Sequence, residues 1–255
     1  VNLPEIEIRE GLHAPRKRPD GHDDDRRDEV AEAGYPLRNL PVLSREQQER
    51  QRVAALYNYE RQFWAKGCDL VAGVDEAGRG PLAGPVCAAA VILPEVCCLP
   101  GLDDSKKLSE RKREALFTQI TEQATAYGIA FASVEEIESM NILSAAMLAM
   151  NRAIEKLGCV PALTLVDGNT VRDIRFPSRA IVGGDGRCAC IAAASVLAKV
   201  TRDRLMKDFA EDYPQYGFEK HKGYGTKAHY EALDRYGPCE IHRMSFLKKY
   251  YERKQ

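Results

Sequence analysis

Residues 73–85 read GVDEAGRGPLAGP, a stretch in which two acidic side chains stand directly before a turn rich in glycine and proline. Apolar runs flank this turn on both sides, LVAGVD at 70–75 and PVCAAAVIL at 85–93. Each run has the length and composition of a buried β-strand. The stretch therefore predicts two consecutive strands joined by a tight turn, with Asp75 and Glu76 at its mouth.

Helices and strands alternate in the sequence that follows. A helix is predicted from near Ser109 to near Gly128, with an inward face of Leu116, Ile120 and Tyr127. Asn141 is expected to cap a second helix, whose buried face is Leu143, Met147, Met150, Ile154 and Leu157. The other predicted elements are strands at 128–134, 162–167 and 179–185 and helices at 186–212 and 227–236. Three early strands followed by strand–helix alternation indicate an α/β fold with a mixed sheet.

The N-terminal part differs in composition. Residues 1–43 lack apolar periodicity and include the charged run DGHDDDRRDE at 20–29, so we expect a poorly ordered tail in which Asp23–Asp25 are weak candidates for metal ligands. Ser44 and Gln47 fit a capping box, which predicts that a helix follows. We therefore expect an N-terminal extension at 1–68, a disordered tail plus a helix, and a main domain at 69–255.

The overall composition bounds the class of protein. The net charge is −1, so a nucleic-acid partner would have to be held by local basic patches. No apolar run reaches the roughly 18–20 residues of a membrane span, and the N-terminus lacks the apolar core of a signal peptide. The eight cysteines form no CxxC pair, so zinc-site spacing is absent and we interpret them as thiols in a reducing cytosol. We expect a cytoplasmic monomer with no membrane partner.

The glycines of the opening stretch have a competing interpretation. Gly78, Gly80 and Ala83 match the GxGxxA fingerprint of dinucleotide-binding folds, and acidic residues follow about 20 positions later. In those folds the turn opens directly into a helix whose N-terminus faces the pyrophosphate. Here prolines bracket the turn, a strand follows it, and Asp75 and Glu76 would put negative charge beside the phosphates. The sequence therefore argues against a nicotinamide or flavin site.

Acidic residues close several of the predicted strands, at Asp75, Glu76, Asp167 and Asp185. Carboxylates at the ends of neighbouring strands can converge, and crowded like charges need cations to neutralise them. Oxygen ligands suit Mg²⁺ or Mn²⁺, and two such ions support phosphodiester hydrolysis. Two points stay open. Aspartate is also an ordinary turn former at strand ends, and adjacent strand residues point to opposite faces unless the strand breaks between them.

The same acidic residues lie within motifs that resemble those of bacterial ribonuclease HII. In the order of the family, these motifs are VDEAGRGPLAGPV (74–86), DDSKKLS (103–109), LVDGN (165–169), GGD (183–185), IAAASVLAKVTRD (191–203) and FEKHKGYGTKAH (218–229). They span about 70–255, and GRG at 78–80 favours this family over ribonuclease HIII, which typically has GKG. Cys190 departs from the pattern, since the family more often has serine there.

The resemblance implies a fold, an activity and a set of site residues. The fold is ribonuclease H-like, a five-stranded mixed sheet flanked by helices. The activity is cleavage of RNA strands hybridised to DNA and cleavage 5′ of single ribonucleotides in duplex DNA, which leaves 3′-hydroxyl and 5′-phosphate ends. The ligands implied for two Mg²⁺ or Mn²⁺ ions are Asp75, Glu76, Asp167 and Asp185. The residues implied to read the 2′-hydroxyl and stack on the following sugar are Gly78, Arg79, Gly80 and Tyr224.

A further group of polar residues is predicted to contact the phosphate backbone: Ser105, Lys106, Lys107, Ser195, Lys199, Arg202, Lys222 and Thr226. Ser195, Lys199 and Arg202 are spaced four and three apart, which places them on one helical face. Thr226 is expected to cap the last helix, whose N-terminus attracts phosphate. For the basic residues a solvated surface charge is the alternative, and for Tyr224 a place in the core.

Two other functions remain compatible with these residues. One is a metal-dependent nuclease without a preference for hybrids, which would cut an all-DNA duplex equally fast. The other is a non-catalytic nucleic-acid-binding protein, which would bind without metal-dependent turnover. The presence of all four acids disfavours the second.

Overall fold

The computed structural model describes residues 43–253. The predictions for residues 1–42, including the poorly ordered tail and Asp23–Asp25, lie outside the described part of the chain. The described residues form one compact unit.

A five-stranded sheet is the centre of the fold. Its strands are β1 (Val71–Ala77), β2 (Val86–Ile92), β3 (Ala126–Ala132), β4 (Leu163–Asp167) and β5 (Ser178–Ile181). They lie in the order β3-β2-β1-β4-β5. The β1–β2 and β2–β3 pairs are antiparallel, whereas the β1–β4 and β4–β5 pairs are parallel. The predicted α/β class and the five-stranded mixed sheet are therefore confirmed.

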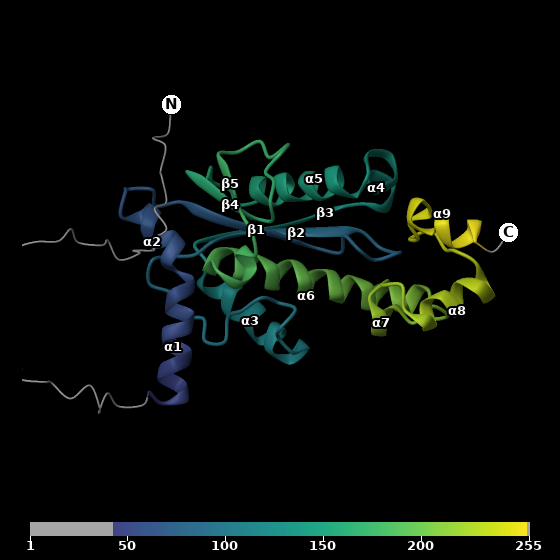
Figure 1. The fold of residues 1–255 in the computed structure, drawn as a ribbon, viewed down its shortest axis with the longest axis horizontal. Coiled ribbons are helices and arrows are strands. Elements are labelled where there is room, and N and C mark those ends of the chain that lie inside the picture. Colours follow the sequence, from purple (N-terminus) through teal and green to yellow (C-terminus); the bar gives the residue numbers. More distant parts are fainter. Residues whose placement is uncertain (1–42, 254–255) are drawn as a thin grey trace, which may run out of the picture. The chain divides into compact units, whose positions relative to one another are not determined.

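Helices flank this sheet and extend beyond it (Figure 1). Their bounds are α1 (Arg45–Leu56), α2 (Asn58–Trp64), α3 (Glu110–Gln123), α4 (Val134–Met140), α5 (Ile142–Glu155), α6 (Ala189–Asp212), α7 (Phe218–His221), α8 (Lys227–Tyr236) and α9 (Met244–Glu252). A 3₁₀ turn, Gly184–Gly186, lies between β5 and α6. None of the helices in the described part is long and apolar enough to cross a membrane.

Helices α5 and α6 pack on opposite faces of the sheet (Figure 1). Small side chains make this close packing possible, because every residue of β2 (VCAAAVI) is buried between the two layers. Gly73 in β1 lies directly against the first turn of α6: a Cβ atom there would be 2.2 Å from the carbonyl carbon of Cys190. Strand β1 and the start of α6 are thereby held in fixed contact at one end of the sheet.

The contact between α5 and β3 yields a stability prediction. A Cβ atom on Gly128 would lie 2.1 Å from the carbonyl oxygen of Ala153, so Gly128→Ala must push α5 away from the sheet. We expect a loss of about 1–3 kcal/mol in the free energy of unfolding, measured by urea denaturation. Tyr127→Phe, at the exposed neighbouring position, is the control and should stay within about 0.5 kcal/mol of the parent protein. Equal stability of both variants would contradict the close packing.

The predicted helix after Ser109 ends earlier than expected. Helix α3 stops at Gln123, and residues 126–132 instead pair with β2 as strand β3. Tyr127 is therefore an exposed strand residue and not part of an inward helical face, a correction that reflects pairing with the fully buried β2. Asn141 does cap α5, where its side chain accepts hydrogen bonds from the backbone N–H groups of Leu143 and Ser144. Leu143, predicted as buried, is 56% exposed.

Two other predicted boundaries move as well. The long helix begins at Ala189, because residues 184–186 form the 3₁₀ turn, and β5 ends at Ile181, so Asp185 follows its strand at some distance. Helices α4, α7 and α9 were not predicted. Short amphipathic segments of this kind carry too few periodic positions for the pattern to stand out.

The N-terminal helix is interrupted at Tyr57, which separates α1 from α2. The capping box at its start is confirmed, since Ser44 and Gln47 each bond the backbone N–H of the other. Both helices contact the main body: Arg52 donates to the carbonyl of Leu102 at 2.8 Å, and Glu60 accepts from the N–H of Cys190 at 2.7 Å. The expected division at residue 68 stays a prediction.

Candidate active site

Three of the four predicted carboxylates lie together at one end of the sheet. Asp75 belongs to β1, Asp167 is the last residue of β4, and Asp185 lies in the 3₁₀ turn Gly184–Gly186. One carboxylate oxygen from each lies within 4.8 Å of the others. The parallel pairing of β1 with β4 explains this convergence, because it brings the carboxyl ends of both strands to the same edge.

Glu76 takes a different position from its neighbour. Strand β1 does not break after Asp75 but continues to Ala77, with Asp75 opposite Ala89 and Glu76 opposite Ala88 in β2. Glu76 therefore lies outside the three-carboxylate cluster, although it lines the same cleft. Its carboxylate is paired with the guanidinium of Arg79 at 3.1 Å. The two adjacent acids therefore take different positions in one cleft: Asp75 belongs to the carboxylate cluster, and Glu76 lies beside it.

The electrostatics of the cluster favour a cation. Burial, followed by the charges of Glu76 and Asp167, raises the pKa of Asp75 well above its ordinary value. The pKa of Glu76 is also raised by burial, an effect that Arg79 opposes. Crowded, desolvated carboxylates with hard oxygen donors are the set that a divalent ion such as Mg²⁺ or Mn²⁺ fits. Asp75, Asp167 and Asp185 are the residues that could hold it.

Neighbouring groups fix the orientation of each carboxylate. Asp167 Oδ1 accepts the N–H of Gly184 at 2.7 Å, which joins the end of β4 to the 3₁₀ turn. Asp185 Oδ2 lies 3.2 Å from the ammonium of Lys106. The buried hydroxyl of Ser195, on α6, donates a hydrogen bond to Asp75 that lowers its pKa, and lies 2.8 Å from the hydroxyl of Ser105. The cluster is therefore held from the sheet, from α6 and from the loop before α3.

The turn Gly78-Arg79-Gly80 begins immediately after β1. Gly78 has φ +98°, in the left-handed region that glycine tolerates, and a Cβ atom there would lie 2.0 Å from Arg202 Nε. Within residues 43–253, the N–H groups of Arg79 and Gly80 have no hydrogen-bond acceptor. The turn thus presents free backbone donors on the wall of the cleft that holds the carboxylates.

Two buried arginines support this turn from below. Arg243 donates to the carbonyl oxygens of Gly78 at 2.6 Å, Gly84 at 2.8 Å and Arg79 at 3.0 Å. Arg202 donates to the carbonyls of Ala83, Pro85 and Lys222. Both side chains are at most 1% exposed. Arg243 is a residue that the sequence analysis missed, because a single arginine about 160 residues from the turn carries no local signal.

Tyr224 faces the turn from the loop between α7 and α8. The ring is 44% exposed, which excludes a place in the core, and its Cε1 atom would be 3.6 Å from a Cβ atom on Gly80. The carbonyl of Tyr224 accepts from His229 Nδ1 at 2.9 Å. Burial lowers the pKa of His229 to about 4, so its imidazole is neutral near pH 7. The other ring nitrogen then accepts from His242 Nε2 at 3.0 Å, which fixes this loop.

Six of the eight residues predicted to contact phosphate fall into three groups. Lys106 and Lys107 are exposed and paired with Asp185 and Asp103. Ser105 and Ser195 are buried beside the carboxylates, and Lys199 pairs with Asp203 at 2.7 Å on the same helix. Thr226 caps α8 through the N–H of His229, as expected. Of the eight, Ser105, Lys106, Ser195, Lys199 and Arg202 line the cleft.

Two of these predictions need correction. Arg202 shares a helical face with Ser195 and Lys199, but it is 1% exposed and its guanidinium is used on three backbone carbonyls. Lys222 is 9% exposed, its ammonium donates to the carbonyl of Glu219, and burial lowers its pKa. Arg202 therefore supports the backbone that follows the turn, and the Lys222 ammonium supports helix α7, because buried donors in folded proteins are paired internally.

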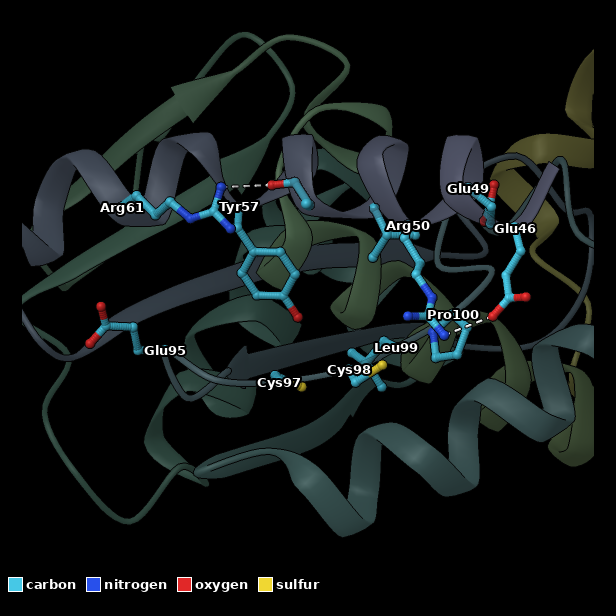
Figure 2. Close-up of a pocket in the computed structure, with 12 residues that line it drawn as sticks. Glu46, Glu49, Arg50, Tyr57, Arg61, Glu95, Cys97, Cys98, Leu99 and Pro100 are labelled. Atoms are coloured by element: carbon cyan, nitrogen blue, oxygen red, sulfur yellow. Dashed lines mark hydrogen bonds and ion pairs between the residues drawn. The ribbon is translucent and has the colours of Figure 1, made fainter. Parts of the chain in front are cut away.

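A second cavity, of about 450 Å³, lies between α1 and the loop that follows β2. Figure 2 shows the Tyr57 ring directed toward the segment that carries Cys97 and Cys98. In the same view, Arg61 donates a hydrogen bond to the backbone carbonyl of Ala54, and Arg50 forms an ion pair with Glu46. Glu46, Glu49 and Glu95 line this cavity but do not form one of the metal-ligating groups found among the described residues, unlike the carboxylates of the cleft of about 480 Å³ that contains Asp75.

The fold and the acidic cluster define a class, the metal-dependent ribonucleases with a ribonuclease H-like fold. Solved structures agree. Ribonuclease H2 from Pyrococcus horikoshii matches with a TM-score of 0.59 at 27% identity, over 72% of this chain and 97% of that one. Ribonuclease HII from Archaeoglobus fulgidus, solved in a complex with PCNA, matches with a TM-score of 0.58 at 25% identity, over 70% and 94%.

Sequence comparisons narrow the class to one family. The family model of ribonuclease HII matches residues 72–249. Ribonuclease HII of Endomicrobium trichonymphae is 55% identical over 75% of this chain and 91% of the relative. Ribonuclease HII of Burkholderia mallei is 57% identical over 70% and 83%. The chain belongs to the ribonuclease HII family, hydrolases that cleave the RNA strand of RNA/DNA hybrids.

Proposed function

We propose that this protein cleaves RNA strands in RNA/DNA hybrids and also cuts 5′ of single ribonucleotides embedded in duplex DNA. The observation that carries the proposal is the shared cleft, in which the free N–H groups of the GRG turn lie beside the carboxylate cluster. A 2′-hydroxyl is the group that separates RNA from DNA. Backbone donors in a glycine turn can approach it because no side chain stands in between.

Each residue has a role in the proposed reaction. Asp75, Asp167 and Asp185 hold two Mg²⁺ or Mn²⁺ ions, and Glu76 completes the ligand set from the adjacent position. When bound, such ions polarise the scissile phosphate and lower the pKa of an attacking water. Ser195 keeps Asp75 oriented through its hydrogen bond, which partly opposes the rise that burial causes in the pKa of Asp75. Water adds to the phosphorus and the 3′-oxygen of the preceding nucleotide leaves, which gives 3′-hydroxyl and 5′-phosphate ends.

Substrate placement involves the remaining residues of the cleft. The backbone of Gly78, Arg79 and Gly80 binds the 2′-hydroxyl, and the exposed ring of Tyr224 stacks on the next sugar. Lys106, Lys107 and Lys199 contact the phosphate backbone, so we expect affinity to fall with salt concentration. Catalysis then consists mainly of positioning and charge stabilisation, with no covalent enzyme intermediate. The protein acts as a cytoplasmic monomer in which residues 69–255 form the catalytic domain and 1–68 an extension.

The ring of Tyr224 gives a prediction about substrate preference. We expect Tyr224→Ala to slow cleavage at a lone ribonucleotide by on the order of tenfold, and to slow cleavage of a long hybrid less, because a lost stacking contact matters most at a single junction. Single-turnover rates on both substrates measure this difference. Tyr224→Phe, which keeps the ring, and Tyr236→Ala, at another exposed tyrosine, should retain the parent rates. Equal losses on the two substrates would remove Tyr224 from junction recognition.

The experiment that tests the proposed function uses an end-labelled DNA duplex with one ribonucleotide. An all-DNA duplex and an EDTA reaction serve as controls. We expect one Mg²⁺- or Mn²⁺-dependent cut on the 5′ side of the ribonucleotide and none in either control. Cleavage of a long hybrid alone would support cleavage of RNA/DNA hybrids and reject the proposed cleavage at single ribonucleotides. Equal cleavage of the all-DNA duplex would favour a nuclease without hybrid preference, and binding without turnover would favour a non-catalytic protein.

A further inference from the structure

A second group of metal-binding side chains lies outside the cleft. Among the described residues, Glu60, Cys188 and Cys190 bring a carboxylate oxygen and two sulfur atoms within 4.8 Å of one another. Glu60 belongs to α2, Cys188 caps α6, and Cys190 lies in the first turn of α6. The Cys188 sulfur is 3.4 Å from the Cys190 sulfur and 3.3 Å from Glu60 Oε1. Residues 128 and 130 positions apart in sequence thus meet at one point.

All three side chains are withdrawn from water. Both thiols are 0% exposed and Glu60 is 1% exposed. Glu60 Oε1 accepts the N–H of Cys190 at 2.7 Å, whereas Oε2 is buried and has no hydrogen-bond partner within residues 43–253. An orphaned buried carboxylate oxygen is costly and rare in folded proteins. A cation held by the carboxylate would satisfy it.

We propose that Glu60, Cys188 and Cys190 form a structural site for a thiophilic divalent cation, Zn²⁺. The site supplies three ligands, the two sulfurs and the carboxylate of Glu60, whose Oε2 has no other partner among the described residues. Thiolate donors select Zn²⁺ over the Mg²⁺ or Mn²⁺ that all-oxygen sites prefer. Tetrahedral Zn²⁺ with bonds of about 2.3 Å to sulfur places two thiolates roughly 3.8 Å apart. The observed 3.4 Å needs to open by only a few tenths of an ångström.

Metal binding at this site is coupled to proton release. Burial raises the pKa of Glu60 and of both thiols, so without a cation these groups retain protons. Binding of Zn²⁺ releases the two thiol protons and the carboxyl proton to solvent, and leaves a net charge of −1 on the site. The site lies at the N-terminus of α6, where the helix dipole favours negative charge. The N–H of Cys190 already points at Glu60.

Zinc bound here would join two parts of the chain. Helix α2 precedes the segment that the family model matches, whereas the start of α6 lies within it. Only Gly186 and Arg187 separate Cys188 from Asp185 of the carboxylate cluster. A metal link at this point holds α2 against the base of the 3₁₀ turn. We therefore expect the cation to raise the thermal stability of the protein, and the effect to be separate from the Mg²⁺ or Mn²⁺ needed for turnover.

Cobalt is the probe that tests this site, because Co²⁺ bound by thiolate gives a near-ultraviolet charge-transfer band that carboxylate ligands do not. The full chain is stripped of metal with EDTA, reduced, desalted without air and titrated with Co²⁺. We expect the band to saturate at about one equivalent and to disappear when Zn²⁺ displaces the Co²⁺. Elemental analysis of protein purified without chelator is expected to find zinc, and added Zn²⁺ is expected to raise the melting temperature.

Variants separate this site from every other metal site. The Cys188→Ser/Cys190→Ser double variant should lose the band, and Glu60→Gln, which keeps both thiols, should weaken Co²⁺ binding at least about tenfold. Cys87→Ser removes a buried thiol elsewhere, and Asp75→Asn alters the carboxylate cluster; both should keep the band. Circular dichroism checks that each variant folds.

Two outcomes would overturn the proposal. Absence of the band in the folded parent protein at excess Co²⁺ would leave the three groups as a hydrogen-bonded cap of α6. A band that survives in the double variant would assign the metal to other cysteines.

Discussion

Asp75→Asn is expected to lower turnover by at least about 10³-fold while the fold stays intact. Asp75 is the most enclosed carboxylate of the cluster, 4% exposed, and it lies within reach of both Asp167 and Asp185. An amide has nearly the same shape but neither the charge nor the second acceptor oxygen with which a carboxylate binds Mg²⁺. Single-turnover cleavage of the ribonucleotide-bearing duplex, across a wide range of Mg²⁺ concentration, measures the effect.

The same variant is not expected to lower the stability of the metal-free protein. The pKa of Asp75 is raised in the folded protein, so the folded state holds the proton more tightly than the unfolded state does. The contribution of protonated Asp75 to the stability of the metal-free protein is therefore lost as pH rises from the unfolded pKa of about 3.9 through the folded pKa. Asparagine cannot ionise, so Asp75→Asn in EDTA should melt at the same temperature as the parent protein or at a higher one near pH 7.

The turnover experiment has a result that would contradict the proposed role. Near-normal turnover of Asp75→Asn at saturating Mg²⁺ would reject Asp75 as a metal ligand.

Arg243→Lys is expected to lower the cleavage rate at a ribonucleotide by about 10²-fold, with a much smaller change in KM. Arg243 holds the carbonyls of Gly78, Arg79 and Gly84 at once, and the geometry of the turn depends on that three-way contact. A lysine retains the charge but its single ammonium cannot span the three acceptors. The turn would then shift relative to the carboxylates, so bound substrate would sit out of line with the attacking water. Rates under single-turnover conditions, at several substrate concentrations, separate kcat from KM.

A loss of stability alone would not explain this result. Arg243→Lys should also cost about 1–3 kcal/mol, because buried carbonyls lose their donors. Arg152→Lys is the matched control: Arg152 donates to the carbonyl of Phe131 and pairs with Glu136, away from the cleft. At a temperature below both melting points, Arg152→Lys should keep the parent kcat. If both variants lose activity in proportion to stability, Arg243 has no positioning role.

Much of the fold could be read from local sequence. The apolar runs around the opening stretch became β1 and β2, and the capping signals at Ser44, Ser109 and Asn141 each mark a helix start. These predictions succeed because strand burial and helix capping depend on residues close together in the chain. Local patterns fail at Tyr127, where the spacing predicts a helix but the residue pairs with β2, more than thirty positions earlier in the chain.

For a similar reason, the sequence predicted the positions of some residues of the candidate site correctly and of others wrongly. Asp167 and Asp185 end or follow parallel strands, so their convergence with Asp75 follows from topology once the strands are known. Glu76 and Arg202 share local spacing with functional neighbours, yet β1 continues through Glu76 and α6 turns Arg202 into the protein. Spacing along one element gives the face on which a residue lies. It does not reveal what packs against that face.

The sequence by itself therefore determined the α/β class, the strands that flank the GRG turn and the family to which the chain belongs, because each depends on motifs or on short-range periodicity. Only the tertiary structure decided that Arg202 and Arg243 lie beneath the turn, that Glu76 stands apart from the three aspartates, and that Glu60 meets two cysteines of α6. The physical reason is the same in each instance. Strand pairing, burial and contacts between residues far apart in the chain arise only when the sheet and its helices are packed together.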